Sequence, residues 1–219
     1  MSENSNNYLH SLNESQREAV ENTSGSTLVL AGAGSGKTRV LTFKLLHLLI
    51  KKILKPSQIL AVTFTNKAAA EMKTRVSKML NFPIDRMWLG TFHSMSLKIL
   101  RNHFEKVGLK KNFVIIDSDD QLKLIKKICD QEKIDTKEIS PKFFSNSIDS
   151  LKNKGIFYNE LKKNKYRNHD EELRKVYSIY QQELLRINCV DFGDLILLCI
   201  KLFKENVEVK NYYQNLFHF

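Results

Sequence analysis

The sequence has few cysteines and no long apolar run. Its three cysteines are Cys129, Cys189 and Cys199, and none belongs to a C-x-x-C pair. This pattern argues against a zinc site or a disulfide framework and favours a reducing compartment. No run of ~18 apolar residues is present, which excludes a membrane-spanning helix. The polar N-terminus, MSENSNNYLH, lacks the basic patch and apolar core of a secretory signal, so we expect a cytoplasmic protein.

The charge of the chain is predominantly positive. Its 219 residues include 35 Lys+Arg and 24 Asp+Glu, a formal net charge of +11. Such an excess favours a polyanionic partner such as nucleic acid. However, 27 of the 35 basic residues are lysine, a bias that is also typical of an A·T-rich genome. The densest basic stretch, Lys162, Lys163, Lys165 and Arg167, is more typical of a solvated face than of a duplex-binding surface. Charge alone therefore leaves nucleic-acid binding open.

Strand-like and helix-like segments alternate in the first half of the chain. Short apolar runs typical of buried strands lie at 27–31, 59–64 and 87–92. Amphipathic helical patterns follow them at 40–49, 66–80 and 94–104. Asn66 is the expected N-cap of the second helix. This alternation predicts an α/β fold with a parallel sheet and crossover helices.

The pattern changes after residue 117. A short strand is expected at 114–116 and ends at Asp117, and residues 118–187 are then lysine-rich and mostly helical. Strong apolarity returns at 190–203. We therefore expect an α/β lobe that is interrupted by a mostly α-helical insertion. The expected parts are the first part of the lobe at 1–116, the insertion at 117–188 and a return to the lobe at 189–219.

Residues 31–38 read AGAGSGKT, between an expected strand and an expected helix. Glycines allow successive backbone N–H groups to turn inward around an anion, and a helix N-terminus adds positive potential. In such a loop Lys37 reaches the β- and γ-phosphates, and the Thr38 hydroxyl completes the coordination of Mg²⁺. The strict pattern has glycine where this chain has Ala31. The loop predicts a site for a nucleoside triphosphate and Mg²⁺, formed by Ala31, Gly32, Ala33, Gly34, Ser35, Gly36, Lys37 and Thr38.

A phosphate loop by itself does not define the function. One alternative is another P-loop NTPase, such as a kinase, with Asp117 as its acidic metal ligand. A second alternative is a non-catalytic module that binds DNA or a protein partner. The segments that flank the loop narrow this choice.

Five segments, in order and spacing, resemble motifs of the UvrD-like superfamily 1 DNA helicases. They are LNESQREAV at 12–20, AVTFTNKAAAEMKTRV at 61–76, LGTFHSMSLKILR at 89–101, VIIDSDDQLKLIKK at 114–127 and DFGDLI at 191–196. The resemblance covers essentially the whole chain. It implies a RecA-like P-loop parallel sheet with helices on both faces, interrupted by the helical insertion. It also implies an ATP-dependent 3′–5′ DNA helicase that uses ATP and Mg²⁺ and acts on single-stranded DNA and duplex junctions.

The resemblance also implies roles for individual residues. Gln16 corresponds to the glutamine that reads adenine, and Arg39 to an arginine stacked on the nucleotide base. The residues that correspond to DNA-facing loops are Thr63, Phe64, Thr65 and Asn66, followed by Thr91, Phe92 and His93. An exposed phenylalanine suits base stacking, and threonine and asparagine suit phosphate and sugar contacts. From the residues alone, Phe64 is equally compatible with the core, and Gln16 and Arg39 with ordinary polar helix positions.

The acidic motif that P-loop enzymes use at the end of another strand has no good candidate here. Asp170–Glu172 follows a segment too polar for a buried strand, and no glutamate follows Asp117. The resemblance places the acidic strand just beyond 212–219. We therefore expect an N-terminal fragment that lacks the second lobe, binds ATP weakly if at all, does not unwind DNA and is marginally stable. A second polypeptide is one possible source of the missing lobe.

Overall fold

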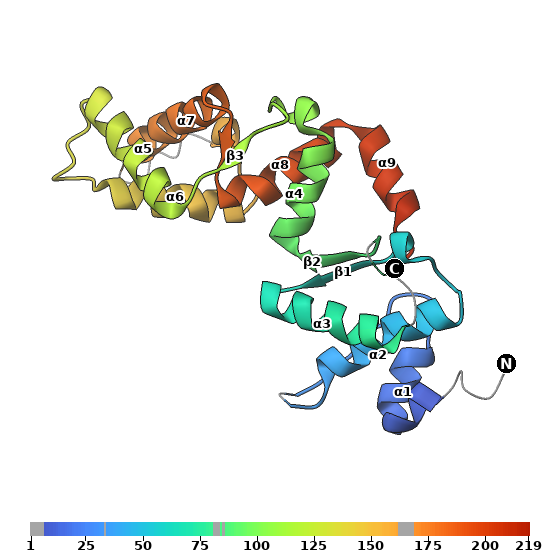
Figure 1. Ribbon diagram of the computed structural model, residues 1–219. Coiled ribbons are helices and arrows are strands. Elements are labelled where there is room, and N and C mark those ends of the chain that lie inside the picture. The colour runs from blue at the N-terminus through green and yellow to red at the C-terminus, as the bar shows by residue number, and fades with distance from the viewer. Residues whose placement is uncertain (1–6, 33, 81–83, 85, 162–168) are drawn as a thin grey trace. The chain divides into compact units, whose positions relative to one another are not determined.

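The computed structural model describes residues 7–32, 34–80, 84, 86–161 and 169–219 (Figure 1). Two sequence predictions lie outside these residues, namely Ala33 in the phosphate loop and the basic stretch at 162–167. The α-helices are α1 Glu14–Glu21, α2 Lys37–Ile50, α3 Asn66–Met79, α4 Phe92–Asn102, α5 Ser118–Gln131, α6 Pro141–Asn153, α7 Asp170–Arg186, α8 Phe192–Glu205 and α9 Val207–Leu216. The strands are β1 Leu60–Thr63, β2 Trp88–Thr91, β3 Val114–Ile115 and β4 Cys189–Val190. Within the described ranges, none of the helices has the length and apolarity needed to cross a membrane.

The chain divides into two compact units. The first unit comprises Met1–Met95 and Tyr212–Phe219, and the second comprises Ser96–Asn211. Each unit combines helices with one pair of parallel strands, so the predicted α/β class is confirmed. In the described part of the chain both sheets have two strands, fewer than the alternation of the sequence suggests. The RecA-like architecture and the three-part division at residues 116 and 188 stay predictions.

The first unit is built on the parallel pair β1–β2. The strands pair from Leu60↔Trp88 to Thr63↔Thr91, and α3 forms the connection between them. Helices α2 and α3 lie on the same side of this pair (Figure 1). Apolar side chains of α2, β1 and α3, such as Met72, form the core there. The second and third predicted strands and the helix between them are therefore confirmed.

The last residue of the chain lies beside β1. The Leu60 N–H donates to the Phe219 carbonyl at 2.7 Å, and the Phe219 N–H approaches the Gln58 carbonyl at 3.4 Å. On the opposite side of β1, the Trp88 N–H donates to the Ile59 carbonyl at 3.1 Å. This alternation is the hydrogen-bond pattern of parallel strands. Strand β1 is therefore paired along both edges at its start.

The predicted strand at 27–31 is wrong for this structure. Leu28 is 83% exposed and Leu30 is 86% exposed. Among the residues that the structure describes, no backbone hydrogen bond joins this segment to a neighbouring strand. A strand depends on hydrogen-bonded neighbours rather than on its own composition, because its backbone groups have no partner within the segment. Apolar composition alone therefore did not produce a strand here.

The second unit is mostly helical. Helices α5, α6 and α7 surround a core in which Phe144, Tyr177 and Tyr180 are fully buried. Strands β3 and β4 pair in parallel, with Val114 opposite Cys189. The mostly helical character of residues 118–187 and the short strand that precedes Asp117 are confirmed. That this segment is an insertion into an α/β lobe stays a prediction.

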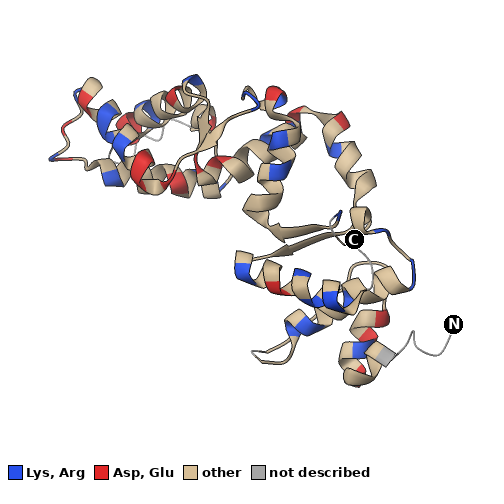
Figure 2. Cartoon of the chain, viewed as in Figure 1, with Lys and Arg blue, Asp and Glu red and all other residues tan. Residues whose placement is uncertain are grey.

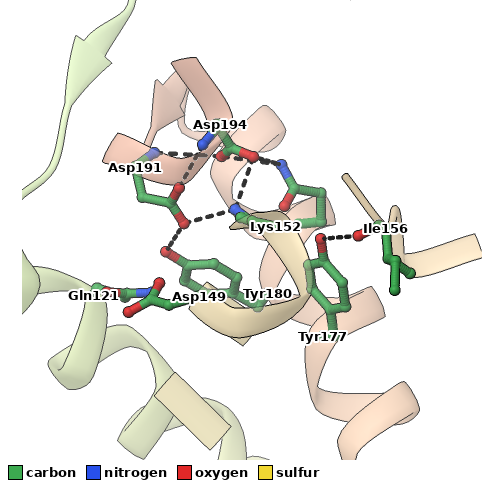
Figure 3. A network of polar contacts seen from close by, with 9 residues as sticks. Gln121, Asp149, Lys152, Ile156, Tyr177, Tyr180, Asp191 and Asp194 are labelled. Atoms are coloured by element: carbon green, nitrogen blue, oxygen red, sulfur yellow. Dashed lines mark hydrogen bonds and ion pairs between the residues drawn. The ribbon is translucent and has the colours of Figure 1, made fainter. Parts of the chain in front are cut away.

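Three helices of the second unit meet at a buried ion cluster (Figure 3). The Lys152 Nζ atom of α6 lies 2.6 Å from an oxygen of Asp191 and 2.7 Å from an oxygen of Asp194, at the start of α8. Tyr180 and Gln181 of α7 donate hydrogen bonds to the same two carboxylates. Burial raises the pKa of Asp194 above its ordinary value, and the Lys152 charge opposes this shift. These five residues, the Lys152 cluster, tie α6, α7 and α8 together.

Candidate functional site

The predicted phosphate loop leads directly into α2. Gly34 and Gly36 have φ angles of 77° and 89°, in the left-handed region that favours glycine. Gly36 is the N-cap of α2 and supplies no side-chain hydrogen bond, so the N–H groups of the first turn are available to an anion. The Ser35 hydroxyl closes the loop by donating to the Gly32 carbonyl at 2.7 Å. The backbone therefore has the geometry expected of a phosphate-binding loop.

Lys37 folds back over this loop from the first turn of α2. Its Nζ atom donates to the carbonyls of Ala31 at 3.0 Å and Gly32 at 2.7 Å. The same side chain lines a cavity of about 550 Å³ that α1, α2 and Phe219 also border. Thr38, the next residue, is exposed. Anionic oxygens are stronger partners for an ammonium group than neutral carbonyls are, so a bound phosphate would displace the two carbonyls from Lys37.

The two predicted base-side residues, Gln16 and Arg39, contact different parts of the first unit. Gln16 on α1 donates from Nε2 to the Ser35 carbonyl at 3.1 Å, and its Oε1 accepts from the Asn13 N–H at 3.3 Å. Arg39 on α2 donates instead to the Ser11 carbonyl at 2.6 Å, with its guanidinium carbon 5.6 Å from the centre of the Phe43 ring. Gln16 thus contacts the phosphate loop directly, whereas Arg39 joins α2 to the 3-10 helix at 7–11.

The two predicted DNA-facing loops lie next to each other. Each follows the carboxyl end of one strand of the β1–β2 pair, where Thr63 is the register partner of Thr91. Phe64 is 96% exposed and Phe92 is 63% exposed. The alternative of a buried Phe64 is therefore excluded. One small area of the first unit carries two exposed aromatic rings.

The threonines of these loops mainly hold the loops in shape. The Thr65 hydroxyl accepts from the Ala68 N–H at 3.1 Å and is the N-cap of α3. The prediction of Asn66 as this cap is wrong, because the chain enters the helix one residue earlier and Asn66 is its first helical residue. The Thr63 hydroxyl donates to the Thr65 carbonyl at 3.0 Å. Asn66 and His93 are exposed at the start of α3 and α4.

The second loop depends on two residues that sequence reasoning missed. The Ser94 hydroxyl accepts from the Thr91 N–H at 2.8 Å, and the Thr91 hydroxyl accepts from the Ser94 N–H at 3.2 Å. A Cβ on Gly90 would lie 2.4 Å from the Ser94 hydroxyl and 2.5 Å from the Met95 methyl group. Gly90 therefore allows the start of α4 to fold tightly against β2. The only sequence signal was the serine three residues after a threonine, a spacing typical of helix caps.

Basic residues follow the first loop along α3. This helix contains Lys67, Lys73, Arg75 and Lys78 and a single acidic residue, Glu71. Figure 2 shows blue predominating over a single red residue on α3, whereas α5, α6, α7 and α8 carry a more even mixture of both colours. An excess of positive charge beside the two exposed rings favours a polyanion at this surface.

The two acidic positions that were compared with the acidic motif of P-loop enzymes, Asp117 and Asp170–Glu172, both lie at the start of a helix. Asp117 caps α5, with one carboxylate oxygen accepting from the N–H groups of Asp119 and Asp120 at 2.9 Å each. Asp170–Glu172 forms the first turn of α7, where negative charge stabilises the helix dipole. Both positions are thus explained by helix formation. Within the described ranges, no group of three or more His, Cys, Asp or Glu side chains is arranged to hold a metal ion.

A glycine-rich segment at the start of α2 and a pair of parallel strands in the same unit define an α/β protein. The chain matches the family model of the UvrD/REP helicase N-terminal domain over residues 12–219, and it belongs to this family. The family resemblance expected from the sequence motifs is therefore confirmed.

Sequence identity to two PcrA proteins supports the same family. The chain is 44% identical to the ATP-dependent DNA helicase PcrA of Staphylococcus aureus (strain Mu50) over 211 residues, which are 96% of this chain and 29% of that protein. It is 43% identical to the protein of the same name from Staphylococcus epidermidis (strain ATCC 12228), with the same coverage. The chain thus spans less than a third of the length of these relatives.

Proposed function

We propose that this chain is the N-terminal part of an ATP-dependent 3′–5′ DNA helicase and that it binds ATP·Mg²⁺ and single-stranded DNA. The observation that carries the proposal is the phosphate loop at 32–38, with Lys37 folded over it and the first turn of α2 open beside it. The PcrA relatives are named as ATP-dependent DNA helicases, which supports the same nucleotide and nucleic acid here. Because the chain spans 29% of their length, unwinding is proposed for the whole protein and binding for this chain.

The triphosphate is proposed to lie on the phosphate loop. Its β- and γ-phosphate oxygens replace the carbonyls of Ala31 and Gly32 as partners of Lys37. Gln16 is proposed to read the adenine edge, and two facts support this: a carboxamide both donates and accepts, and the Gln16 side chain contacts the loop. Arg39 lies on the same helix two residues after Lys37 and provides a planar cation for the base.

The chemistry of the loop also fits Mg²⁺. The exposed hydroxyl of Thr38 in the first turn of α2 is a hard oxygen ligand of the kind this ion prefers. When bound, the ion neutralises charge on the phosphates. The protein contributes the position of the Thr38 oxygen next to Lys37, so one helix turn holds both the metal ligand and the phosphate ligand.

Single-stranded DNA is proposed to cross the ends of β1 and β2. Neighbouring strands lie about 4.8 Å apart, so Phe64 and Phe92 present two rings to one nucleic-acid strand. Asn66 and His93 are polar groups at the edges of these rings. The net positive charge of α3, which begins at Asn66 directly after the first loop, attracts the phosphates. This arrangement binds without base-specific hydrogen bonds, as a translocating protein requires.

The proposal predicts that DNA and nucleotide act on each other in the whole protein. Single-stranded DNA should increase its rate of ATP hydrolysis at least ~10-fold, since the strand binds to loops of the unit that holds the nucleotide. Hydrolysis measured with and without an oligothymidylate tests this. A protein that binds the oligonucleotide with equal affinity with and without nucleotide, and whose hydrolysis does not change, is instead a non-catalytic binding module.

Replacing Phe64 with alanine should weaken single-stranded DNA binding. Stacking on an aromatic ring contributes about 2 kcal/mol per base, so we expect roughly 30-fold lower affinity. Fluorescence anisotropy of a labelled oligothymidylate measures the change. Phe64→Trp should retain affinity, and Tyr212→Ala, which removes another exposed ring of the first unit, is the matched control. Unchanged affinity of Phe64→Ala would place the DNA elsewhere.

A further inference from the structure

Lys44 is a buried lysine in the middle of α2. The residue is 6% exposed, two turns after Lys37 on the same helix. Its Nζ atom donates to the carbonyls of Ala19 at 3.3 Å and Val20 at 3.2 Å, and also to the carbonyl of Asn22. These three carbonyls belong to the C-terminal end of α1. One ammonium group therefore donates hydrogen bonds to three carbonyls at the C-terminal end of the neighbouring helix.

The contact pairs a positively charged group with the partially negative C-terminal end of a helix. The last carbonyls of an α-helix have no partner within the helix and carry a partial negative charge. Burial lowers the pKa of Lys44 from its ordinary value, because it penalises the charged form. A buried ammonium is tolerated where hydrogen bonds replace water, and here three carbonyls do so. Loss of the ammonium removes this shared donor from all three carbonyls.

The opposite end of α1 lies at the phosphate loop. Helix α1 has eight residues, and Gln16 in its first turn donates to the Ser35 carbonyl at 3.1 Å. Near the C-terminal end of α1, Val20 packs with Val40 and Phe43 in a small apolar cluster. Such apolar contacts are not directional, so they permit a short helix to rotate about them. The hydrogen bonds at the two ends set its orientation.

We propose that Lys44 is a positioning residue that orients α1 on α2 and thereby holds the Gln16 carboxamide where it distinguishes adenine from other bases. This inference rests on the proposed function, and it assigns base selection to a residue outside the predicted nucleotide-binding residues, although Lys44 lines the same cavity as Lys37. Lys37 and Thr38 belong to α2 itself. Their hydrogen bonds go to Ala31, Gly32 and α2 rather than to α1, so we expect binding of the phosphates and selection of the base to be separable.

Competition of three ligands against a fluorescent ATP analogue tests the inference in the 219-residue chain. The ligands are ATP, ITP and inorganic tripolyphosphate, and ITP has a carbonyl where ATP has the exocyclic amine. Lys44→Met, which keeps the apolar stem, should lower the preference for ATP over ITP about 10-fold, the effect of one hydrogen bond. Affinity for tripolyphosphate should stay within about 2-fold. Lys44→Arg should restore the preference, because the guanidinium group also donates to carbonyls.

Two controls separate the possible results. Gln16→Ala should lower the ATP preference as Lys44→Met does, and the double variant should lower it no further. Lys78→Met removes an exposed lysine of the first unit and should change nothing. If Lys44→Met does not fold, Lys44→Gln, which keeps a neutral donor, takes its place.

Several outcomes would overturn the inference. They are an unchanged ATP preference in Lys44→Met, an equal loss of affinity for all three ligands, or no restoration by Lys44→Arg. An equal loss indicates a role in stability alone. If the wild-type chain binds neither ATP nor tripolyphosphate, the proposed function fails as well. If it binds both in a manner that depends on Lys37 and only the Lys44 result is negative, the proposed function stands and the positioning role fails.

Discussion

Lys37→Ala should lower the affinity of the chain for ATP about 100-fold. The ammonium lies over the phosphate loop and contacts the carbonyls of Ala31 and Gly32. A charge-assisted hydrogen bond contributes about 1.5–3 kcal/mol, and Lys37 is placed to make more than one with the phosphates. Titration of a fluorescent ATP analogue measures the loss. Tripolyphosphate should show the same decrease, since the removed contacts go to phosphate and not to the base.

The fold should tolerate this substitution. Lys37 is exposed, and its two hydrogen bonds go to carbonyls of an exposed loop, which water solvates in its absence. Surface substitutions of this kind usually change stability by less than about 0.5 kcal/mol. Lys78→Ala on α3 is the matched control. Equal ATP affinity in Lys37→Ala and the wild-type chain, with unchanged thermal unfolding, would falsify the proposed phosphate site.

The turn at 34–36 and the start of α2 were predictable because they depend on local sequence. Two glycines adopt positive φ angles within three residues, and lysine follows at the start of a helix. All the information for that geometry lies in one short segment. Strands β1 and β2 were predictable for a related reason, since their apolar runs also pair with each other in the structure. The segment at 27–31 had equally apolar residues, but a strand forms only where a neighbouring chain segment accepts its hydrogen bonds.

The positions of Lys44 and Lys152 were not predictable from the sequence. Lysine is among the residues least often buried, so sequence alone predicts that both side chains lie on the solvent-exposed faces of their helices. Their burial depends on partners distant along the chain, the carbonyls at 19–22 for one and the carboxylates of α8 for the other. The motif DFGDLI indicated family resemblance without showing that Asp191 and Asp194 face a lysine. Pairings of this kind are set by the tertiary fold rather than by local pattern.

Gly193, next to the Lys152 cluster, is another residue whose role could not be predicted from the sequence. A Cβ at this position would lie 2.9 Å from Cδ and 3.0 Å from Cβ of Lys152. The glycine therefore allows the first turn of α8 to approach α6 closely enough for the ion pairs to form. The sequence shows a glycine in a helix, which by itself indicates only lower helix propensity.

Lys152→Met should destabilise the second unit by about 3–5 kcal/mol, the usual cost of removing one partner from a buried ion pair. The substitution leaves the carboxylates of Asp191 and Asp194 buried without their cation. Their remaining donors are Tyr180, Gln181 and backbone N–H groups at the start of α8. Chemical denaturation, followed by circular dichroism, measures the change. Lys154→Met, which removes an exposed lysine two residues later, should stay within about 0.5 kcal/mol of the wild type.

The pH dependence of this variant identifies the cause of its instability. Burial already raises the pKa of Asp194, and loss of Lys152 removes the charge that opposes this shift. The folded variant then binds more protons than the unfolded chain above pH 3.8, the ordinary pKa of this carboxyl, so its stability falls as the pH rises. The difference between wild type and Lys152→Met should therefore be larger at neutral pH than near pH 4. Adding Asp194→Asn, which removes one uncompensated charge, should recover part of the loss at neutral pH. A loss that is independent of pH and unaffected by Asp194→Asn would instead indicate a packing defect, because the apolar stem of Lys152 packs against Gly193.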